Sequence, residues 1–426
     1  MALLVAACGA GGPVERDAGV ASSDAPEAGD AAISLTELVL VAPMGATTTY
    51  LVDREQRVIH RWESADPPAL GARLLADGAL LRTASPARLA VGSRFDAGGA
   101  GGRIERLGWD GELEWAFELS DDTTRLHHDA TPLANGHVLV IAWEHVDEAT
   151  AESLGRPAAT VDAEGLWTEA VLELAPRGAD GADIVWEWHA RDHLGSEPHR
   201  IDLARGGRAP DVMHLNSVEL DTEHDEVIVS AHGYGEIWVI DHHTTTEEAR
   251  TSAGDLLYRW GNPAAYGTGG TGPRELYGQH DARVIPRGIP GEGHITIFDN
   301  GLRRPDGSYS RVLELAIPRD PDGAPRLDGE RFAEPERAWE HTAPTPTDLY
   351  AENISSAQRL ASGNTLVCAG TSGWLVEVTP DGETTWELRW PLSSRGTPTL
   401  LFRAELIASD HPGLAGRSLE PMGPLE

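Results

Sequence analysis

The sequence of 426 residues has few cysteines, few basic residues and no long apolar run. Its two cysteines, Cys8 and Cys368, are too few for a disulfide-rich scaffold or a cysteine-ligated zinc module. Acidic residues number 68 against 34 basic ones, and the resulting net charge of −34 repels phosphate backbones and argues against nucleic-acid binding. No stretch reaches the roughly 20 apolar residues of a membrane-spanning helix. Hydrophobic residues nevertheless make up 40% of the chain, which is enough for a large core.

The first 33 residues differ in composition from the rest of the chain. Residues 4–8, Leu-Val-Ala-Ala-Cys, have the order of a bacterial lipobox, in which small residues precede a cysteine that receives lipid. We therefore expect residues 1–8 to be a lipoprotein signal remnant with Cys8 as the lipidated residue. Residues 9–33, rich in Gly, Ala, Asp and Ser, are expected to form a disordered tether. These features predict an exported periplasmic or cell-surface lipoprotein of the outer membrane, held to the membrane only by lipid. The alternative is a chance terminus on a cytoplasmic protein.

A unit of two strands recurs six times along the chain, and the second strand of each copy carries a tryptophan. Asp-Gly turns separate the two strands in several copies, as at 110–111 and 381–382, because these residues tolerate the positive φ of tight hairpins. Successive tryptophans lie 53, 71, 74, 79 and 47 residues apart. We interpret them as packing residues between repeats; they are Trp62, Trp115, Trp186, Trp260, Trp339 and Trp386.

A second recurring element, a turn that ends in glycine, lies between the tryptophan units. It reads Leu-Ala-Asp-Gly at 75–78, and related strings follow at 133–136, 285–288 and 360–363, with a degenerate copy at 220–223. Apolar strands flank each turn, so every repeat offers about four strands, as propeller blades do. We predict an all-β six-bladed β-propeller over residues 34–410 and a C-terminal tail at 411–426. The strand at 38–41 is expected to close the last blade and hide the sheet edges.

Alignment of the repeats on the glycine turn places histidines at equivalent positions. His128 and His280 each stand five residues before the turn, Ser355 stands there in another repeat, and the matching place in the third repeat falls at or near His214. Equivalent positions of a propeller share one radius and height, so these side chains should converge near the central channel. Strand alternation places Asn216 on the same face as His214. Converging imidazoles are suited to nucleophilic attack, proton transfer or metal binding.

Several short strings around these positions resemble the bacterial arylsulfate sulfotransferases when they are taken in order. The strings are LHHD at 126–129 with LANG at 133–136, MHLNS at 213–217, QHDAR at 279–283, IFDNG at 297–301, SSAQRL at 355–360 and EVTPDG at 377–382. The resemblance extends from about residue 45 to about residue 405. It implies a six-bladed propeller, in agreement with the count of tryptophan units.

The resemblance also implies an activity: transfer of a sulfuryl group from a phenolic sulfate ester to a phenolic acceptor, through a transiently sulfated histidine. It implies no nucleotide-sulfate donor, other cofactor or metal. By local motif, His280 resembles the nucleophile of the family, and His128, His214 and Asn216 resemble the groups that hold the sulfuryl oxygens and shuttle protons. Ser355, at the equivalent position of another repeat, is added to the expected substrate-binding residues.

One position departs from the family pattern. The family carries an arginine in the strand after its His-x-Asn motif, whereas this chain reads Ser-Ala-His-Gly at 230–233, so His232 takes the place of the arginine. Histidine keeps an N–H donor but lacks the permanent charge and the bidentate fork. Arg283 and Arg303 are the candidates to supply that charge. The family's separate amino-terminal domain, linked to its dimerisation, has no counterpart here, so we expect a monomer.

Two other hypotheses remain open at this point. Four histidines, with His232 as the fourth, are enough to hold a transition metal for hydrolytic or redox chemistry. The propeller is also compatible with a tethered binding module, in which the long insertions at 145–168 and 318–338 would contact a saccharide or a protein.

Overall fold

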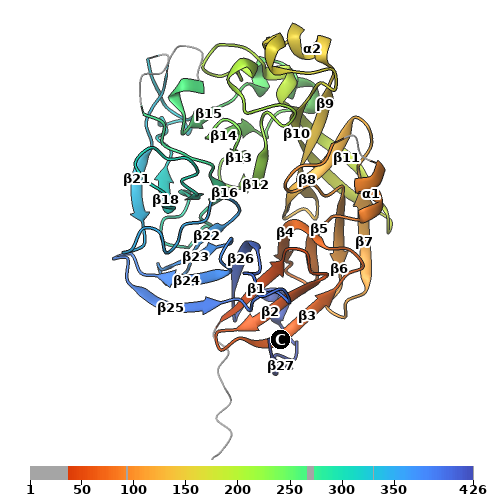
Figure 1. Ribbon diagram of the computed structural model, residues 1–426, viewed down its shortest axis with the longest axis vertical. Coiled ribbons are helices and arrows are strands. Elements are labelled where there is room, and N and C mark those ends of the chain that lie inside the picture. The colour runs from red at the N-terminus through yellow and green to blue at the C-terminus, as the bar shows by residue number, and fades with distance from the viewer. Residues whose placement is uncertain (1–36, 93–94, 266–272, 330, 426) are drawn as a thin grey trace, which may run out of the picture. The chain divides into compact units, whose positions relative to one another are not determined.

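The computed structural model describes residues 37–92, 95–265, 273–329 and 331–425 (Figure 1). Cys8, the expected signal remnant at 1–8 and the expected tether at 9–33 lie outside the described residues. Within these ranges, none of the helices has both the length and the apolar character needed to cross a membrane.

Six antiparallel sheets form a ring, which confirms the predicted six-bladed β-propeller (Figure 1). Blade 1 consists of β26 (Leu401–Ala408), β1 (Glu37–Pro43), β2 (Thr48–Asp53) and β3 (Arg57–Glu63), with β27 (Gly423–Pro424) added outside β3. Blade 2 consists of β4 (Pro68–Leu74), β5 (Leu80–Ala84), β6 (Arg103–Leu107) and β7 (Leu113–Glu118). Blade 3 consists of β8 (Thr124–Pro132), β9 (Val138–Val146), β10 (Leu166–Arg177) and β11 (Gly181–His189).

The other three blades repeat this order. Blade 4 consists of β12 (Leu215–Asp221), β13 (Glu226–Ala231), β14 (Glu236–Asp241) and β15 (Tyr258–Trp260). Blade 5 consists of β16 (His280–Val284), β17 (Ile295–Asp299), β18 (Arg311–Ala316) and β21 (Glu336–His341). Blade 6 consists of β22 (Ser356–Arg359), β23 (Thr365–Ala369), β24 (Trp374–Val378) and β25 (Thr384–Arg389).

Short elements occupy the connections between these strands. They are the hairpin of β19 (Leu327–Asp328) and β20 (Arg331–Phe332), the helices α1 (Ala87–Gly92), α2 (Glu148–Ser153) and α3 (Thr246–Ala249), and the 3-10 turns at Ala158–Thr160, Ala190–His193, Leu203–Arg205, Ser252–Gly254, Pro263–Ala265 and Pro412–Leu414. The last 3-10 turn and β27 fall within the expected C-terminal tail.

Strand β1 closes the ring between the two ends of the chain, as predicted. It pairs with β2 on one side and with β26 on the other, where Leu38 faces Ile407 and Val39 faces Leu406. The closed blade contains the first tryptophan hairpin, β2–β3, because the sixth hairpin already has its own inner strands, β22 and β23. Closure therefore leaves each blade with four paired strands.

The outer tryptophans link each blade to the next. The indole Nε1 of Trp115 donates to the carbonyl of Gly181 at 2.8 Å, and Trp339 donates to the carbonyl of Pro380 at the same distance. Trp186, Trp260 and Trp386 reach the corresponding connections of their next blades, at Thr244, Glu334 and Arg54. Trp62 packs against Trp109 of blade 2, with ring centroids 5.4 Å apart. These contacts agree with a packing role for the repeated tryptophans.

The first strand of each blade lies at the axis, and these six strands contact one another in a closed ring. Hydrogen bonds fix their relative register, because in four of these strands one side chain accepts a backbone N–H of the next blade. Asp129 accepts from Val218, Ser217 from Ala282, Asp281 from Ala357 and Ser356 from Ala404. These four acceptors are therefore equivalent positions around the axis.

Two layers of axial side chains follow from this register. The layer one residue before the acceptors is Leu70, His128, Asn216, His280, Ser355 and Phe402. The layer two residues after them is Arg73, Thr131, Glu219, Arg283, Gln358 and Glu405. A strand rises about 3.3 Å per residue, so the two layers lie roughly 10 Å apart along the axis.

Candidate functional site

Four imidazoles form an arc at the first of these layers. Ring centroids lie 4.8 Å apart between His128 and His214, 5.1 Å between His214 and His232, and 5.4 Å between His232 and His280. Phe402 closes the arc, with its ring 6.1 Å from His128 and 6.3 Å from His280. The structure thus brings together the three histidines that the repeat predicted and adds His232 between them.

The cluster has a buried side and an accessible side. His128 is 2% exposed and His280 is 4% exposed, whereas the side chain of His214 is 21% exposed. His232 is half-buried. A small molecule would therefore meet His214 and His232 before it reaches the two deep imidazoles.

The third repeat differs in alignment from the sequence-based prediction. Ser217 is equivalent to Asp129 and Asp281, so the residue that matches His128 and His280 is Asn216, and His214 lies two residues earlier. The glycine turn is degenerate in this repeat, and its true start is one residue later than the apolar match at Leu220 suggested. His214 joins the cluster from the connection before β12.

β-Bulges turn the axial histidines toward one another. The ladder shifts register between His127 and Ala130 in β8, and between His280 and Arg283 in β16. The backbone φ is 49° at His128 and 50° at His214, in the left-handed region that non-glycine residues rarely adopt. Bulges re-aim side chains, and such strain collects at functional sites.

The contacts of His280 fix which of its nitrogens carries the proton. Its Nδ1 lies 2.8 Å from Asn300 Oδ1 and 3.1 Å from the Gly278 carbonyl, and both partners are acceptors, so Nδ1 carries the proton. The amide of Asn300 is itself fixed, because its Nδ2 donates to the carbonyls of Ala351 and Ile354 at 2.8 Å each. Nε2 of His280 therefore keeps its lone pair, toward which the Ile354 N–H points from 3.3 Å.

Burial keeps three of the four imidazoles uncharged. Burial, with a further contribution from the nearby His214, lowers the pKa of His280 to about 4, although the Asn300 contact opposes the shift. Burial and the neighbouring histidines also hold the pKa values of His128 and His232 well below their usual range. At neutral pH these three rings are free bases, and an unprotonated imidazole is a nucleophile.

The remaining polar groups of the site differ in how fully they are bonded. Nδ1 of His214 lies 2.5 Å from Asp211 Oδ2, a contact that orients the ring. Nδ2 of Asn216 donates to the Gln279 carbonyl at 2.9 Å, while its buried Oδ1 has no hydrogen-bond partner in the described part of the chain. Ser355 Oγ accepts from the Gly370 N–H at 2.9 Å and donates to the Asn353 carbonyl, so its hydroxyl is already engaged.

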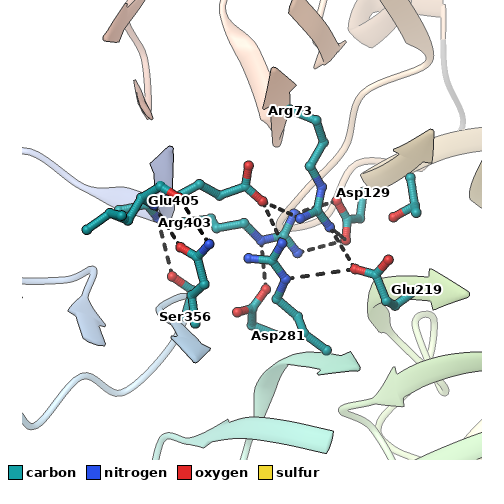
Figure 2. Close-up of polar contacts among 12 residues, drawn as sticks. Arg73, Asp129, Glu219, Asp281, Ser356, Arg403 and Glu405 are labelled. Atoms are coloured by element: carbon teal, nitrogen blue, oxygen red, sulfur yellow. Dashed lines mark hydrogen bonds and ion pairs between the residues drawn. The ribbon is translucent and has the colours of Figure 1, made fainter. Parts of the chain in front are cut away.

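A network of arginines and carboxylates fills the axis below the histidines. The guanidinium of Arg403 donates twice to Asp129 at 2.8 Å and once to Asp281 at 2.7 Å, and Figure 2 shows these side chains converging from separate blades. Arg73 bonds to Glu405 and lies 3.3 Å from Glu219 in the same view. Arg403, Asp129 and Asp281 thus lie between the histidine layer and the second layer, to which Arg73, Glu219 and Glu405 belong.

Neither arginine candidate joins the histidines. Arg283 lies in the second layer, where it donates to Glu405 at 2.6 Å and lines a pocket with Arg73 and Glu219. Arg303 is exposed in the turn after β17. Among the described residues, the place of the family arginine is therefore taken by the uncharged ring of His232.

The described histidines and carboxylates were also compared with the geometry that a metal ion requires. In the described ranges, the group of three such side chains whose ligand atoms all lie within 4.8 Å of one another is Asp221, His224 and Glu226. Arg319 approaches this group and lies 2.5 Å from Glu226 and 3.7 Å from Asp221. The four axial histidines do not form so tight a group.

The fold and the axial histidines define a class of protein, a six-bladed propeller with imidazoles gathered on its axis. The family whose sequence pattern matches is Arylsulfotransferase (ASST), over residues 102–387. This match spans more than half of the chain, so the chain belongs to the arylsulfotransferase family. A search of curated proteins finds no match.

Solved structures give only distant matches. A protein of unknown function from Bacteroides caccae is 12% identical with a TM-score of 0.47, over 87% of this chain and 99% of that one. A functionally unknown protein from Desulfotomaculum acetoxidans is 7% identical with a TM-score of 0.44, over 88% and 100% of the two chains. A putative 6-phosphogluconolactonase from Bacteroides uniformis is 11% identical with a TM-score of 0.41, over 88% and 100%.

Several residues of the site were not predicted from the sequence. Asp211, which orients His214, and Phe402, which closes the arc, lie in segments without a recurring signal. Asn300 belongs to a string that resembles the family, and its place directly after a buried strand was the available signal.

Proposed function

We propose that this member of the arylsulfotransferase family transfers a sulfuryl group from a phenolic sulfate ester to a phenolic acceptor, with His280 as the transiently sulfated residue. The observation that carries the proposal is the fixed tautomer of His280: Asn300 holds the proton on Nδ1, so Nε2 carries the lone pair, which accepts only the Ile354 N–H at 3.3 Å among the described residues. Family membership supports the reaction class.

In the first half-reaction, the lone pair of His280 Nε2 attacks sulfur, an N–S bond forms and the S–O bond to the aryl group breaks. The departing phenolate oxygen takes a proton from a neighbouring imidazole. In the second half-reaction, the acceptor phenol gives its proton to that imidazole, its oxygen attacks sulfur and the N–S bond breaks. The site returns to its starting state, and no external oxidant, reductant or nucleotide is consumed.

The other axial groups are assigned to the sulfuryl oxygens and to proton transfer. We assign proton transfer to His128 and His214, whose rings are neighbours in the arc that contains the nucleophile. We assign His232 and the second N–H of the Asn216 amide, whose first N–H is bonded to the Gln279 carbonyl, to the sulfuryl oxygens, which carry spread negative charge and are stabilised by fixed donors. Ser355 lies in the same layer, but its hydroxyl is already hydrogen-bonded to the backbone, so we assign it no direct contact with the sulfuryl group.

Neither Arg283 nor Arg303 reaches the arc. Burial, the neighbouring histidines and Arg274 together lower the pKa of His232, which has a consequence for substrate binding. An arginine attracts an anionic ester at any pH, whereas neutral imidazoles offer N–H donors only and gain charge when an anion raises their pKa. Substrate affinity should therefore depend on pH, with tighter binding of the sulfate ester as the pH falls from 8 to 6.

The test uses the purified protein with 4-nitrophenyl sulfate as donor and phenol as acceptor. We expect release of nitrophenol with ping-pong kinetics, and an acid-labile sulfated peptide that contains His280 when acceptor is left out. His280→Ala should abolish both, while His243→Ala, at an exposed histidine away from the axis, should leave both unchanged. Absence of nitrophenol release and of the sulfated peptide from the folded wild-type protein would refute the proposal.

The same preparation separates the two hypotheses that the sequence left open. A stoichiometric transition metal that is lost in His232→Ala, together with activity that requires it, would replace sulfohistidine chemistry by metal chemistry. Saccharide or protein binding that is unchanged in His280→Ala, with no sulfuryl transfer, would indicate a binding module.

A further inference from the structure

Two buried side chains lie directly behind His128 and have no part in the function proposed above. His127 is 2% exposed, and its ring stacks on Trp143 with centroids 4.0 Å apart. Glu169, on β10, is 0% exposed. Both project from strands of blade 3.

The contacts of these side chains form a continuous chain of proton-bearing atoms. Glu169 Oε2 lies 2.8 Å from His127 Nε2, and His127 Nδ1 lies 2.7 Å from His128 Nδ1. The other carboxyl oxygen of Glu169 accepts the Leu215 N–H at 2.9 Å. The chain leaves one nitrogen of His128 unused, its Nε2, and this atom belongs to the ring that faces His214.

The short contact between two Nδ1 atoms allows one proton between them, because two lone pairs or two protons would repel. Two arrangements satisfy the chain while both imidazoles stay uncharged. In the first, Glu169 is protonated and donates to His127, His127 donates from Nδ1 to His128, and His128 carries its proton on Nε2. In the second, Glu169 is ionised, His127 is protonated on Nε2, and His128 is protonated on Nδ1 with a lone pair on Nε2. The second arrangement holds one proton fewer.

The buried surroundings favour the first arrangement in the resting protein. Burial, reinforced by the nearby carboxylates of Asp211 and Glu144, raises the pKa of Glu169 well above its usual range. His127 stays uncharged because burial also lowers its pKa. A protonated carboxyl beside two neutral imidazoles is thus the ground state from which a proton is released.

We propose that Glu169 is the proton store of the site and acts through His127 on His128, the residue that protonates the leaving phenolate. This inference rests on the sulfuryl transfer proposed above. As the S–O bond breaks, the phenolate oxygen takes the proton from His128 Nε2, the His127 Nδ1 proton moves to His128 Nδ1, and the Glu169 proton moves to His127 Nε2. Both imidazoles stay neutral and Glu169 becomes a carboxylate. The acceptor phenol reverses each step, so the exchange needs no proton from solvent.

The arrangement answers a difficulty that His128 alone would present. A buried imidazole with a depressed pKa is rarely an imidazolium at neutral pH, so it is a poor acid by itself. A neutral imidazole that receives a proton at Nδ1 while it gives one at Nε2 avoids both the imidazolium and the imidazolate. Glu169 and His127 are positioning residues in this scheme, and of these three residues only His128 contacts the substrate.

The test compares Glu169→Gln with the wild type over a series of aryl sulfates whose phenols differ in pKa. Glutamine accepts from Leu215 and donates to His127 as the protonated carboxyl does, but it has no transferable proton. We expect a loss of roughly 10²-fold or more in kcat/KM for phenyl sulfate, which needs an acid, and less than about 3-fold for 4-nitrophenyl sulfate, whose phenolate leaves unaided. In Glu169→Gln, kcat/KM should therefore fall more steeply with the pKa of the leaving phenol than it does in the wild type.

Glu173→Gln is the matched control, since Glu173 lies on the same strand and contacts His137 and His242 away from the axis. When log kcat/KM is plotted against the pKa of the leaving phenol, Glu173→Gln should give a line parallel to that of the wild type. A parallel line for Glu169→Gln as well would overturn the proposal, because a residue with a structural role alone slows all esters equally.

Nitrogen NMR of histidine-labelled wild-type protein tests the store without any activity. We expect His127 to be protonated on Nδ1 and His128 on Nε2 at pH 7. The opposite pair of tautomers would mean that Glu169 is ionised at rest and would overturn the proposal. A protein that shows the expected tautomers but releases no phenol from any ester would instead refute the sulfuryl transfer.

Discussion

At the scale of single residues, the chemistry of the site depends on how each imidazole is held. His280 is defined by Asn300, whose amide is locked by two backbone carbonyls. Its low pKa comes from burial, which removes the water that would stabilise an imidazolium. A ring of the same type at the surface would be partly protonated near neutrality and would present either nitrogen.

The pKa of His280 predicts how the rate of sulfohistidine formation falls at low pH. Attack requires the neutral ring, and a pKa of about 4 keeps the ring neutral until the pH approaches that value. Formation of sulfohistidine in single-turnover experiments should be constant above about pH 5 and should fall below about pH 4. A fall in this rate near the ordinary histidine pKa of about 6.5 would contradict the assignment of His280 as the nucleophile. Because the folded-state pKa is depressed, the same group should cost stability as the pH falls from about 6.5, so circular dichroism at each pH is the control.

Asn300→Ala should remove the control of the tautomer. Without an acceptor at Nδ1, the proton of His280 is free to move to Nε2 and to block the attacking lone pair. We expect sulfohistidine formation to slow by roughly 10²-fold or more, in line with other sites where the wrong tautomer is allowed. Ser310→Ala is the control: Ser310 donates to the Asn300 carbonyl but does not touch its amide, so this variant should lose stability without a comparable loss of rate.

At the scale of single elements, the site is built where inner strands depart from a regular ladder. The bulge in β8 places His128 in a left-handed conformation, and the turn at Gly99 covers its ring. The His128 N–H donates to the Gly99 carbonyl at 2.8 Å, which ties the turn to the bulge. Such a close approach is open only to glycine.

Gly99→Ala should displace His128, because a Cβ at this position would lie 2.2 Å from its Cε1. Gly136→Ala is a close match: Gly136 has the same φ of 84°, and no atom lies within 4 Å of the added Cβ. Each variant should lose about 1 kcal/mol of stability from backbone strain. Only Gly99→Ala should also lower kcat by 10-fold or more with phenyl sulfate, whose leaving group needs the acid. Equal rates in the two variants would show that His128 does not depend on the turn.

At the scale of the whole molecule, six blades contribute one axial residue each to every layer. The ring can place an uncharged nucleophile layer roughly 10 Å from a second, charged layer, since successive positions of all six strands stack along one axis. Arg403 holds the boundary, and it joins blade 1 to Asp129 of blade 3 and Asp281 of blade 5. Closure of the ring by β1 and β26 therefore also completes the axial network.

Arg403→Met should be strongly destabilising at neutral pH, because it leaves Asp129 and Asp281 buried without their cation. The expected loss is about 3–5 kcal/mol in the free energy of unfolding, measured by denaturant titration. Burial favours the protonated form of Asp129, but Arg403 outweighs it and lowers the pKa of this carboxyl. Without the arginine the pKa of Asp129 rises. The difference in the free energy of unfolding between variant and wild type should therefore narrow as the pH falls from 7 to 4.

Arg88→Met is the comparison for this loss. Arg88 pairs with Glu118 at 2.9 Å, but its side chain is 58% exposed, so its removal should cost less than about 1 kcal/mol. A similar small loss for Arg403→Met would mean that the axial network does not hold the blades together.

The sequence by itself determined the repeats and much of what they position. Two-residue alternation, glycine turns and outer tryptophans predicted six blades, the closing strand at 38–41 and the gathering of His128, His214 and His280. These features are local, since a strand, a turn and a repeat period are all written in a few consecutive residues.

Only the tertiary structure decided which partners each of these residues meets. In the third repeat the position equivalent to His128 and His280 is Asn216, two residues after His214, and the hydrogen bonds between neighbouring blades fix it. Arg283 stands three residues from His280 in the sequence, yet the rise of the strand places it in the charged layer. Asp129 and Arg403 are 274 residues apart and meet only because the ring closes, so no local pattern could have paired them.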